Sequence, residues 1–210
     1  MRFIDQPDLT DLGFKEIRVI YAAEMWRHKK VTEHPDVEYL KFYLNHKLED
    51  SEYYCIDIEH WDTDNRRVDN ETLDANIQKY ITVLDSFRKY KPNSIIGNYG
   101  MFPIRDYHVP VKGKDKDIKL WQTSNAKLQP LADKADIIYP SLYTFYKRPN
   151  GWEKYAIANI NEAKKYGKKV IPFIWPQYHS SNKLRRYDHI DGEFWRQQLE
   201  IIYQHADGVV

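Results

Sequence analysis

The segment Tyr53–Trp61, with the sequence YYCIDIEHW, begins as a buried strand and ends in charged residues. Its first four residues are aromatic or apolar, which is typical of a strand covered on both faces. Asp57 and Glu59 lie two positions apart, and side chains at that spacing share one face of a strand, about 6.6 Å apart along it. Because carboxylates are seldom buried without a partner or a function, the segment predicts a core strand that presents two carboxylates to one space.

Five other segments have the composition of short buried strands: 16–22, 94–100, 135–143, 169–175 and 207–210. Mostly apolar residues share helix faces between them: Val37, Leu40, Leu44 and Leu48; Leu73, Ile77, Ile81, Leu84 and Phe87; Trp152, Tyr155, Ile160 and Ala163; and Phe194, Gln198, Leu199 and Ile202. Gly167 is placed to end the third of these helices. Pro130 is placed to begin a short helix within the less regular stretch 117–134.

This alternation predicts an α/β fold with parallel strands. Six strands are too few for the standard eight-stranded barrel, so we expect a distorted or incomplete TIM-like (β/α) barrel. An open, doubly wound sheet remains the alternative. We expect residues 1–210 to form a single catalytic barrel domain that lacks its first strand and ends inside its last.

The charge balance argues against two classes of partner. The chain has 32 Lys and Arg against 31 Asp and Glu, so neither nucleic acid nor a membrane surface is an expected ligand. No segment approaches the roughly 20 apolar residues of a spanning helix. Cys55 is the only cysteine, which excludes an internal disulfide, and we expect it to be buried.

Aromatic residues are abundant, with 17 Tyr and 6 Trp, which fits either a Tyr-rich core or a surface for sugars. In parallel α/β folds, functional sites gather at the carboxyl ends of strands, and a sugar site needs flat rings and carboxylates there. The expected substrate-binding residues at these ends are Trp61, Asn98, Trp175, Gln177 and Tyr178.

The spacing of Asp57 and Glu59 bears on the chemistry. The usual glycosidase places its two carboxylates on opposite sides of the scissile bond, which two neighbours on one strand face do not readily do. The pair suits a substrate-assisted reaction, in which the sugar's own N-acetyl oxygen attacks. Two different roles for the carboxylates stay open: structural pairing with Arg66 and Arg67, and a metal site that includes His60, although a strand would turn His60 to the opposite face.

Five segments resemble, in order, motifs of the family 56 hyaluronidases among the glycoside hydrolases: YYCIDIEHW, IIGNYGMFP, KLQPLADKADIIYPSLY, KKVIPFIWPQYH and FWRQQLEIIYQHADGVV. The resemblance implies a distorted barrel in which Glu59 is the acid/base and Asp57 orients the acetamido group. It also implies that Tyr99 and Tyr143 line the cleavage subsite and that Trp175 and Tyr178 shape the sugar groove. Neither a metal nor another cofactor is expected.

The chain departs from this family in three respects. The family's I-W-G tryptophan would fall just beyond Val210, and an extra residue precedes Pro103. The disulfides of animal members cannot form with one cysteine. These departures indicate a distant or bacterial-type member whose substrate need not be hyaluronan.

The resulting prediction is a glycosidase that cleaves an N-acetylhexosamine-containing polysaccharide with retention of configuration. Basic loop segments make an acidic glycosaminoglycan one candidate substrate: 27–30, 66–67, Arg105, 112–116, 147–148 and 183–186. One rival is a conventional two-carboxylate glycosidase that uses Glu24 or Asp106 as its second carboxylate. The other is a carbohydrate-binding or degenerate module without turnover. A polysaccharide hydrolase favours a secreted or periplasmic location, although no secretory signal opens this sequence.

Overall fold

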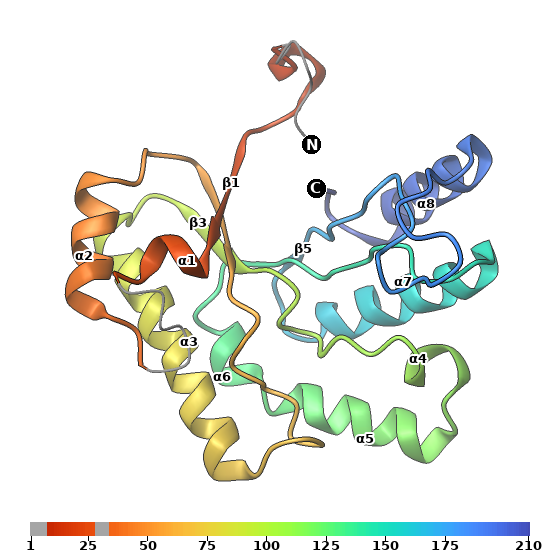
Figure 1. The fold of residues 1–210 in the computed structure, drawn as a ribbon, viewed down its shortest axis with the longest axis horizontal. Helices are drawn as coiled ribbons and strands as arrows, with labels where there is room; N and C mark the ends of the chain where they lie inside the picture. Colours follow the sequence, from red (N-terminus) through yellow and green to blue (C-terminus); the bar gives the residue numbers. More distant parts are fainter. Residues whose placement is uncertain (1–7, 28–33) are drawn as a thin grey trace.

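The computed structural model describes residues 8–27 and 34–210. Strands and helices alternate along most of this chain, and Figure 1 shows the helices flanking the strands. The elements, in order, are a 3-10 helix η1 (Thr10–Leu12), β1 (Ile17–Tyr21), α1 (Ala22–Met25), α2 (Val37–His46), β2 (Tyr53–Asp57), α3 (Asn70–Tyr90), β3 (Ile95–Asn98), α4 (Val109–Lys112), α5 (Asp115–Ala126), α6 (Gln129–Ala132), β4 (Ile137–Ile138), α7 (Pro149–Lys164), β5 (Lys169–Val170) and α8 (Gly192–His205).

All strand pairs within the two sheets are parallel. One sheet has the order β1-β2-β3 and the other pairs β4 with β5. The two sheets adjoin, because Tyr99 forms a parallel bridge with Tyr139 and the Asp136 amide donates to the Ile96 carbonyl at 2.8 Å. The strands therefore follow one another in space in the order in which they occur along the chain.

The strands are shorter than the sequence predicts, and those described do not close into a barrel. β4 and β5 each have two residues, and Pro140 and Pro172 follow them closely. Proline has no amide hydrogen to donate, so it interrupts a strand ladder. The predicted strand 207–210 is not a strand. Its backbone still forms a hydrogen bond with the segment that follows β5, where the Val210 amide donates to the Pro172 carbonyl at 2.9 Å.

Between β1 and the C-terminal residues, none of the described helices covers the strands (Figure 1). A cavity of about 480 Å³ lies at the amino ends of the strands, and Tyr53, Ile95, Ile137 and Lys169, the first residues of four strands, contribute to its lining. This cavity is at the opposite end of the strands from Asp57, which is the last residue of β2.

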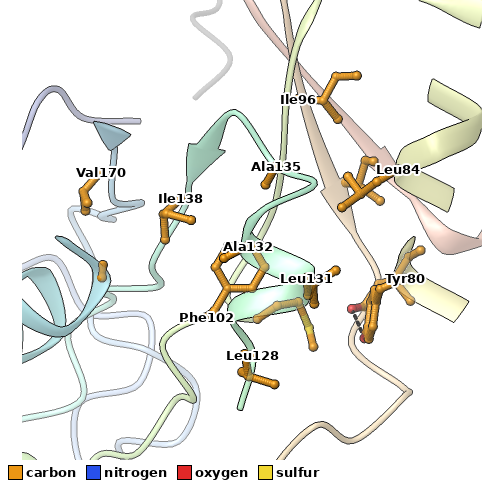
Figure 2. Close-up of a cluster of buried hydrophobic side chains, with 14 of the residues drawn as sticks. Tyr80, Leu84, Ile96, Phe102, Leu128, Leu131, Ala132, Ala135, Ile138 and Val170 are labelled. Carbon is orange, nitrogen blue, oxygen red and sulfur yellow. Dashed lines mark hydrogen bonds between the residues drawn. The ribbon is translucent and has the colours of Figure 1, made fainter. Parts of the chain in front are cut away.

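The core has two layers. The inner cluster comprises Cys55, Tyr99, Ile137, Tyr139 and Phe173, with Tyr143, Ile171 and Val210 among the partly buried residues around it. The larger outer cluster lies between the strands and helices. Figure 2 shows Leu131 and Ala132 of α6 in its middle, between side chains of α3, β3 and β5.

Helix α3 illustrates how the sequence fixes the elements around β2. Asp69 caps it by accepting a hydrogen bond from the Thr72 amide at 2.7 Å, and this cap sets where the helix begins. Tyr80 on its buried face donates a hydrogen bond to the Ile58 carbonyl at 2.8 Å (Figure 2 labels Tyr80). The helix therefore holds the backbone between Asp57 and Glu59.

The helical predictions agree with the structure in their main features. α2, α3, α7 and α8 lie where the apolar spacing predicts them, and the stretch 117–134 divides into parts of α5 and α6. Gly167 has the left-handed φ of 71° that suits a residue following a helix end. Among the described residues, no helix is both long and apolar enough to cross a membrane.

Candidate functional site

The two carboxylates lie at the carboxyl end of β2. Asp57 continues the inner face that begins with Tyr53 and Cys55, and it is half-buried. Glu59 lies two residues farther and is exposed, with 46% of its side chain accessible. The arrangement gives one sheltered and one accessible carboxylate at the same mouth.

The electrostatics of Asp57 differ from those of a surface carboxyl. Burial, together with the charge of Glu59, raises the pKa of Asp57 from 3.8 to about 6, although the positive charge of Arg105 opposes the shift. No hydrogen bond from a described residue contributes to this shift. Asp57 is therefore mostly ionised at neutral pH and able to accept a hydrogen bond from a ligand.

Glu59 forms an ion pair with Arg105, with 2.8 Å between Oε1 and the guanidinium nitrogen. The pairing with Arg66 and Arg67 that the sequence left open is wrong, because those two side chains bind aspartates of their own loop and of the next. Arg66 lies 2.7 Å from Asp64 and 2.9 Å from Asp106. Arg66 and Arg67 therefore pair with these aspartates and not with Asp57 or Glu59.

Tyr99 and Tyr143 lie side by side on the inner face, with ring centroids 6.0 Å apart. The Tyr99 hydroxyl and Ser141 Oγ are hydrogen-bonded at 2.9 Å. Burial raises the pKa of both tyrosines, so their hydroxyls stay protonated. The negative charge of Asp57 also raises the pKa of Tyr143, so Asp57 and the tyrosine pair are neighbours on the inner face.

Two of the five expected substrate-binding residues are partly exposed, Trp175 and Gln177. Trp175 is half-buried, and its ring centroid is 5.9 Å from that of Tyr143. Gln177 is half-buried as well, and its amide nitrogen lies 3.5 Å from the Nε2 atom of His189. Trp175 therefore extends the aromatic surface that begins with Tyr99 and Tyr143.

The other three are buried and are not placed to contact a ligand. Trp61 is only 3% exposed and packs edge-on against Trp26 and Tyr80. Tyr178 is 1% exposed, with Arg185 over its ring. Both belong to the outer cluster, as large aromatic side chains near a strand end do when helices cover them.

Asn98 lies on the opposite face of β3 from Tyr99. Its register partner is Ile56, which belongs to the outer cluster, and Asn98 is fully buried there. Neither atom of its side-chain amide has a hydrogen-bond partner in the described chain. The alternation of a strand thus places Asn98 away from the inner face.

The two candidates for the second carboxylate of a conventional two-carboxylate glycosidase, Glu24 and Asp106, already have other hydrogen-bond partners. Glu24 accepts a hydrogen bond from the Tyr43 hydroxyl at 2.8 Å. Asp106 binds Arg66 and the backbone amides of His108 and Val109. Burial raises the pKa of Asp106, but these amides and Arg66 outweigh that effect and lower it overall.

The metal-site alternative receives no support from the arrangement of His60. Its ring packs against Trp61 and Trp26, with centroids 4.9 and 6.0 Å away. In the two described ranges, no group of three or more His, Cys, Asp and Glu side chains could hold a metal ion.

Sequence reasoning did not assign Arg105 to the site and treated it only as one of several basic loop residues. The structure places its guanidinium against Glu59, with its Cζ 6.0 Å from the centre of the Tyr107 ring. His179 is a second addition: its ring stacks on Tyr143 at 6.0 Å. Of the basic segment 27–30, residues 28–30 lie outside the described residues.

The parallel strand order, the helical cover and the polar carboxyl ends define an α/β fold of the incomplete (β/α)-barrel type. The fold is similar to that of bee venom hyaluronidase, with a TM-score of 0.69 and 16% identity over 93% of this chain and 77% of that one. A structure of bee venom hyaluronidase in complex with a hyaluronic acid tetramer is also similar, with a TM-score of 0.66 and 16% identity over 92% and 77% of the two chains. No family model matches the chain, and no characterised protein matches it by sequence. The resemblance inferred from five short motifs is confirmed at the level of the fold.

Proposed function

We propose that this chain is a glycoside hydrolase that cleaves an N-acetylhexosamine-containing polysaccharide by a substrate-assisted, retaining mechanism. The observation that carries the proposal is the juxtaposition of Asp57 and Glu59 at one strand end with the paired rings of Tyr99 and Tyr143. The similarity in fold to bee venom hyaluronidase supports it. Residues 1–210 would act as one catalytic domain.

In the first step, protonated Glu59 gives its proton to the glycosidic oxygen as the bond to the anomeric carbon breaks. The carbonyl oxygen of the substrate's acetamido group attacks that carbon and forms a cyclic oxazolinium ion. In the second step, Glu59 takes a proton from water, whose oxygen attacks the anomeric carbon and reopens the ring. Two inversions at one carbon give net retention, and Glu59 ends protonated as it began.

Asp57 serves the same reaction as an anion. Its carboxylate accepts the acetamido N–H and stabilises the positive charge that develops on the nitrogen. A pKa of about 6 keeps it ionised at neutral pH. The protonated hydroxyls of Tyr99 and Tyr143 supply hydrogen-bond donors beside it, and Trp175 offers a face on which a sugar ring can stack.

An acidic glycosaminoglycan is a substrate candidate because Arg105 lies at the mouth, and because a protein of similar fold is described with bound hyaluronic acid. The conventional mechanism with Glu24 or Asp106 is less well supported, since both carboxylates already have partners.

The test is Glu59→Gln, assayed for hydrolysis and for binding of acetamido polysaccharides such as hyaluronan and chondroitin. We expect turnover to fall by at least about 100-fold while binding is retained. A matched control is Glu153→Gln on α7, whose carboxylate accepts a hydrogen bond from Gln197 and contacts neither site carboxylate. If wild type and Glu59→Gln bind sugar equally and neither hydrolyses any acetamido polymer, the chain is a binding module and the proposal is wrong. Hydrolysis of polymers that lack the N-acetyl group would exclude the assisted mechanism.

A further inference from the structure

Two ion pairs join the loop that follows β2 to the loop that follows β3. Glu59 of the first loop binds Arg105 of the second at 2.8 Å, and Arg66 of the first binds Asp106 of the second at 2.9 Å. Each loop thus supplies one acid and one base, and the two partners in the second loop are consecutive residues. We call these four residues the crossed ion pairs.

The Arg66–Asp106 pair is the better sheltered of the two. Both of its side chains are 17% exposed. Arg66 also binds both carboxylate oxygens of Asp64, each at 2.7 Å, and Asp64 is only 3% exposed. A guanidinium that binds a carboxylate with two parallel bonds has little orientational freedom, so this pair is a fixed point between the loops.

The backbone on the other side of Arg105 is fixed as well. The Ile104 amide donates to Asn125 Oδ1 at 2.7 Å, and the Ile104 carbonyl accepts from Trp121 Nε1 at 2.8 Å. Asn125 and Trp121 belong to α5 and are almost fully buried. Arg105 therefore lies between two neighbours, of which Ile104 cannot shift without breaking buried hydrogen bonds and Asp106 cannot shift without breaking partly buried ones.

We propose that Arg105 is a positioning residue for Glu59, held in place by the Arg66–Asp106 pair, and that it fixes the acid/base carboxylate beside Asp57. This inference rests on the proposed hydrolase function. Glu59 follows the end of β2 and is the more exposed of the two site carboxylates, so its own strand does not set its rotamer. The guanidinium of Arg105 supplies that constraint from the neighbouring loop through Oε1, to which it can donate whether or not the other oxygen of Glu59 carries the catalytic proton.

Arg105 also acts on the other carboxylate. Its positive charge lowers the pKa of Asp57, against the larger effects of burial and of Glu59, which raise it. Without Arg105 the pKa of Asp57 would rise above about 6. Because the reaction uses ionised Asp57, the acid limb of the pH–activity profile would then move to higher pH. Loss of an arginine remote from Asp57 would not produce this shift.

The experiment compares Arg105→Gln, Arg105→Lys and Arg105→Ala with wild type in the full chain, using hyaluronan or chondroitin, whichever wild type hydrolyses. A matched control is Arg88→Gln, which removes another partly exposed arginine ion pair, to Asp136, near the amino ends of the strands. The kcat and KM values are measured from about pH 4 to about pH 8. Circular dichroism establishes that each variant is folded.

We expect Arg105→Gln to lower kcat about 10- to 100-fold with little change in KM, and to move the acid limb upward. Arg105→Lys should keep the position of the acid limb, because it keeps the charge, but recover only part of kcat. Added guanidinium ion should restore part of the activity of Arg105→Ala. Arg88→Gln should match wild type.

If Arg105→Gln retains both the kcat and the acid limb of wild type, the inference is overturned while the hydrolase function stands. Should the glutamine variant not fold, the same result for Arg105→Lys overturns the inference. If wild type hydrolyses no acetamido polysaccharide, the proposed function fails and the inference fails with it, before any variant is compared. The two failures are therefore distinguishable.

Discussion

At the scale of single residues, Asp57 is held in a state that costs stability. Its pKa in the folded chain is about 6, above the ordinary value of 3.8, so the folded chain binds this proton more tightly than the unfolded chain does. The free energy of unfolding therefore decreases as the pH rises from about 4 through about 6. An ionised carboxyl that is kept half-buried, with no hydrogen bond from a described residue to stabilise its charge, is typical of a functional group.

We expect Asp57→Asn to raise the free energy of unfolding at neutral pH by about 1 to 2 kcal/mol, after allowance for solvent screening, because the amide bears no charge. The gain should disappear near pH 4, where the wild-type carboxyl is protonated in the folded state. Urea denaturation at the two pH values measures this. A variant less stable than wild type at neutral pH would contradict the assigned cost. The same substitution should greatly reduce hydrolysis.

The sequence was informative about the site wherever strand alternation decides the direction of a side chain. It placed Asp57 and Tyr99 on strands whose ends meet, and Tyr143, expected at the end of the fourth strand segment, lies beside Tyr99 in the structure. It erred for Trp61 and Tyr178, because composition cannot distinguish an aromatic residue that lines a groove from one that helices cover. It did not connect Arg105 with Glu59, since that contact depends on the conformation of two loops.

At the scale of elements, Gly97 allows β3 and β4 to approach closely. A Cβ atom at this position would lie 2.3 Å from the Ile137 carbonyl oxygen and 2.8 Å from the Tyr139 ring. Both obstacles belong to the β4 segment, and one of them is backbone, so neither can move aside at low cost. The junction between the two sheets therefore requires glycine here.

We expect Gly97→Ala to lower the free energy of unfolding by about 2 to 3 kcal/mol. A matched control is Gly192→Ala at the first position of α8, where an added Cβ meets nothing within 4 Å. That control should stay within about 0.5 kcal/mol of wild type. Equal stability of the two variants in urea would show that β3 and β4 do not approach as described.

Helices were predicted more accurately than strands, and the reason is physical. Four long helices carry a repeating apolar face that marks them along their whole length. β4 and β5 have two residues each and are limited by Pro140 and Pro172, which the apolar runs 135–143 and 169–175 conceal. Hydrogen bonds to individual carbonyls, rather than continuous ladders, join the later strands.

At the scale of the whole molecule, the described strands differ in how many neighbours they pair with. β2 is paired on both sides, by β1 and β3, whereas β1 pairs with β2 alone among the described strands. The parallel α/β architecture followed from the alternation of segments. The alternation did not predict whether the strands close into a ring, because closure depends on the tilt and pairing of the outermost strands.

We expect backbone amides of β1 to exchange with solvent deuterium faster than those of β2, since half of the polar groups of β1 face no described strand. Mass spectrometry of peptides that cover 17–21 and 53–57 measures this. Equal protection of the two strands would mean that the outer edge of β1 is covered. Dilution of the sample would then reveal whether a second copy of the chain covers it.

The burial of Cys55 gives the chain a chemical reporter of its own interior. It is the only cysteine, it is 0% exposed, and it lies two residues before Asp57 on the inner face. Burial raises the pKa of its thiol well above the ordinary value of 9.0, so the reactive thiolate is scarce. An alkylating reagent can modify this thiol only when the inner cluster opens. The labelling rate in native buffer therefore reports how fast the inner cluster opens, without any introduced probe. A bound sugar chain that stabilises the strand ends should lower this rate.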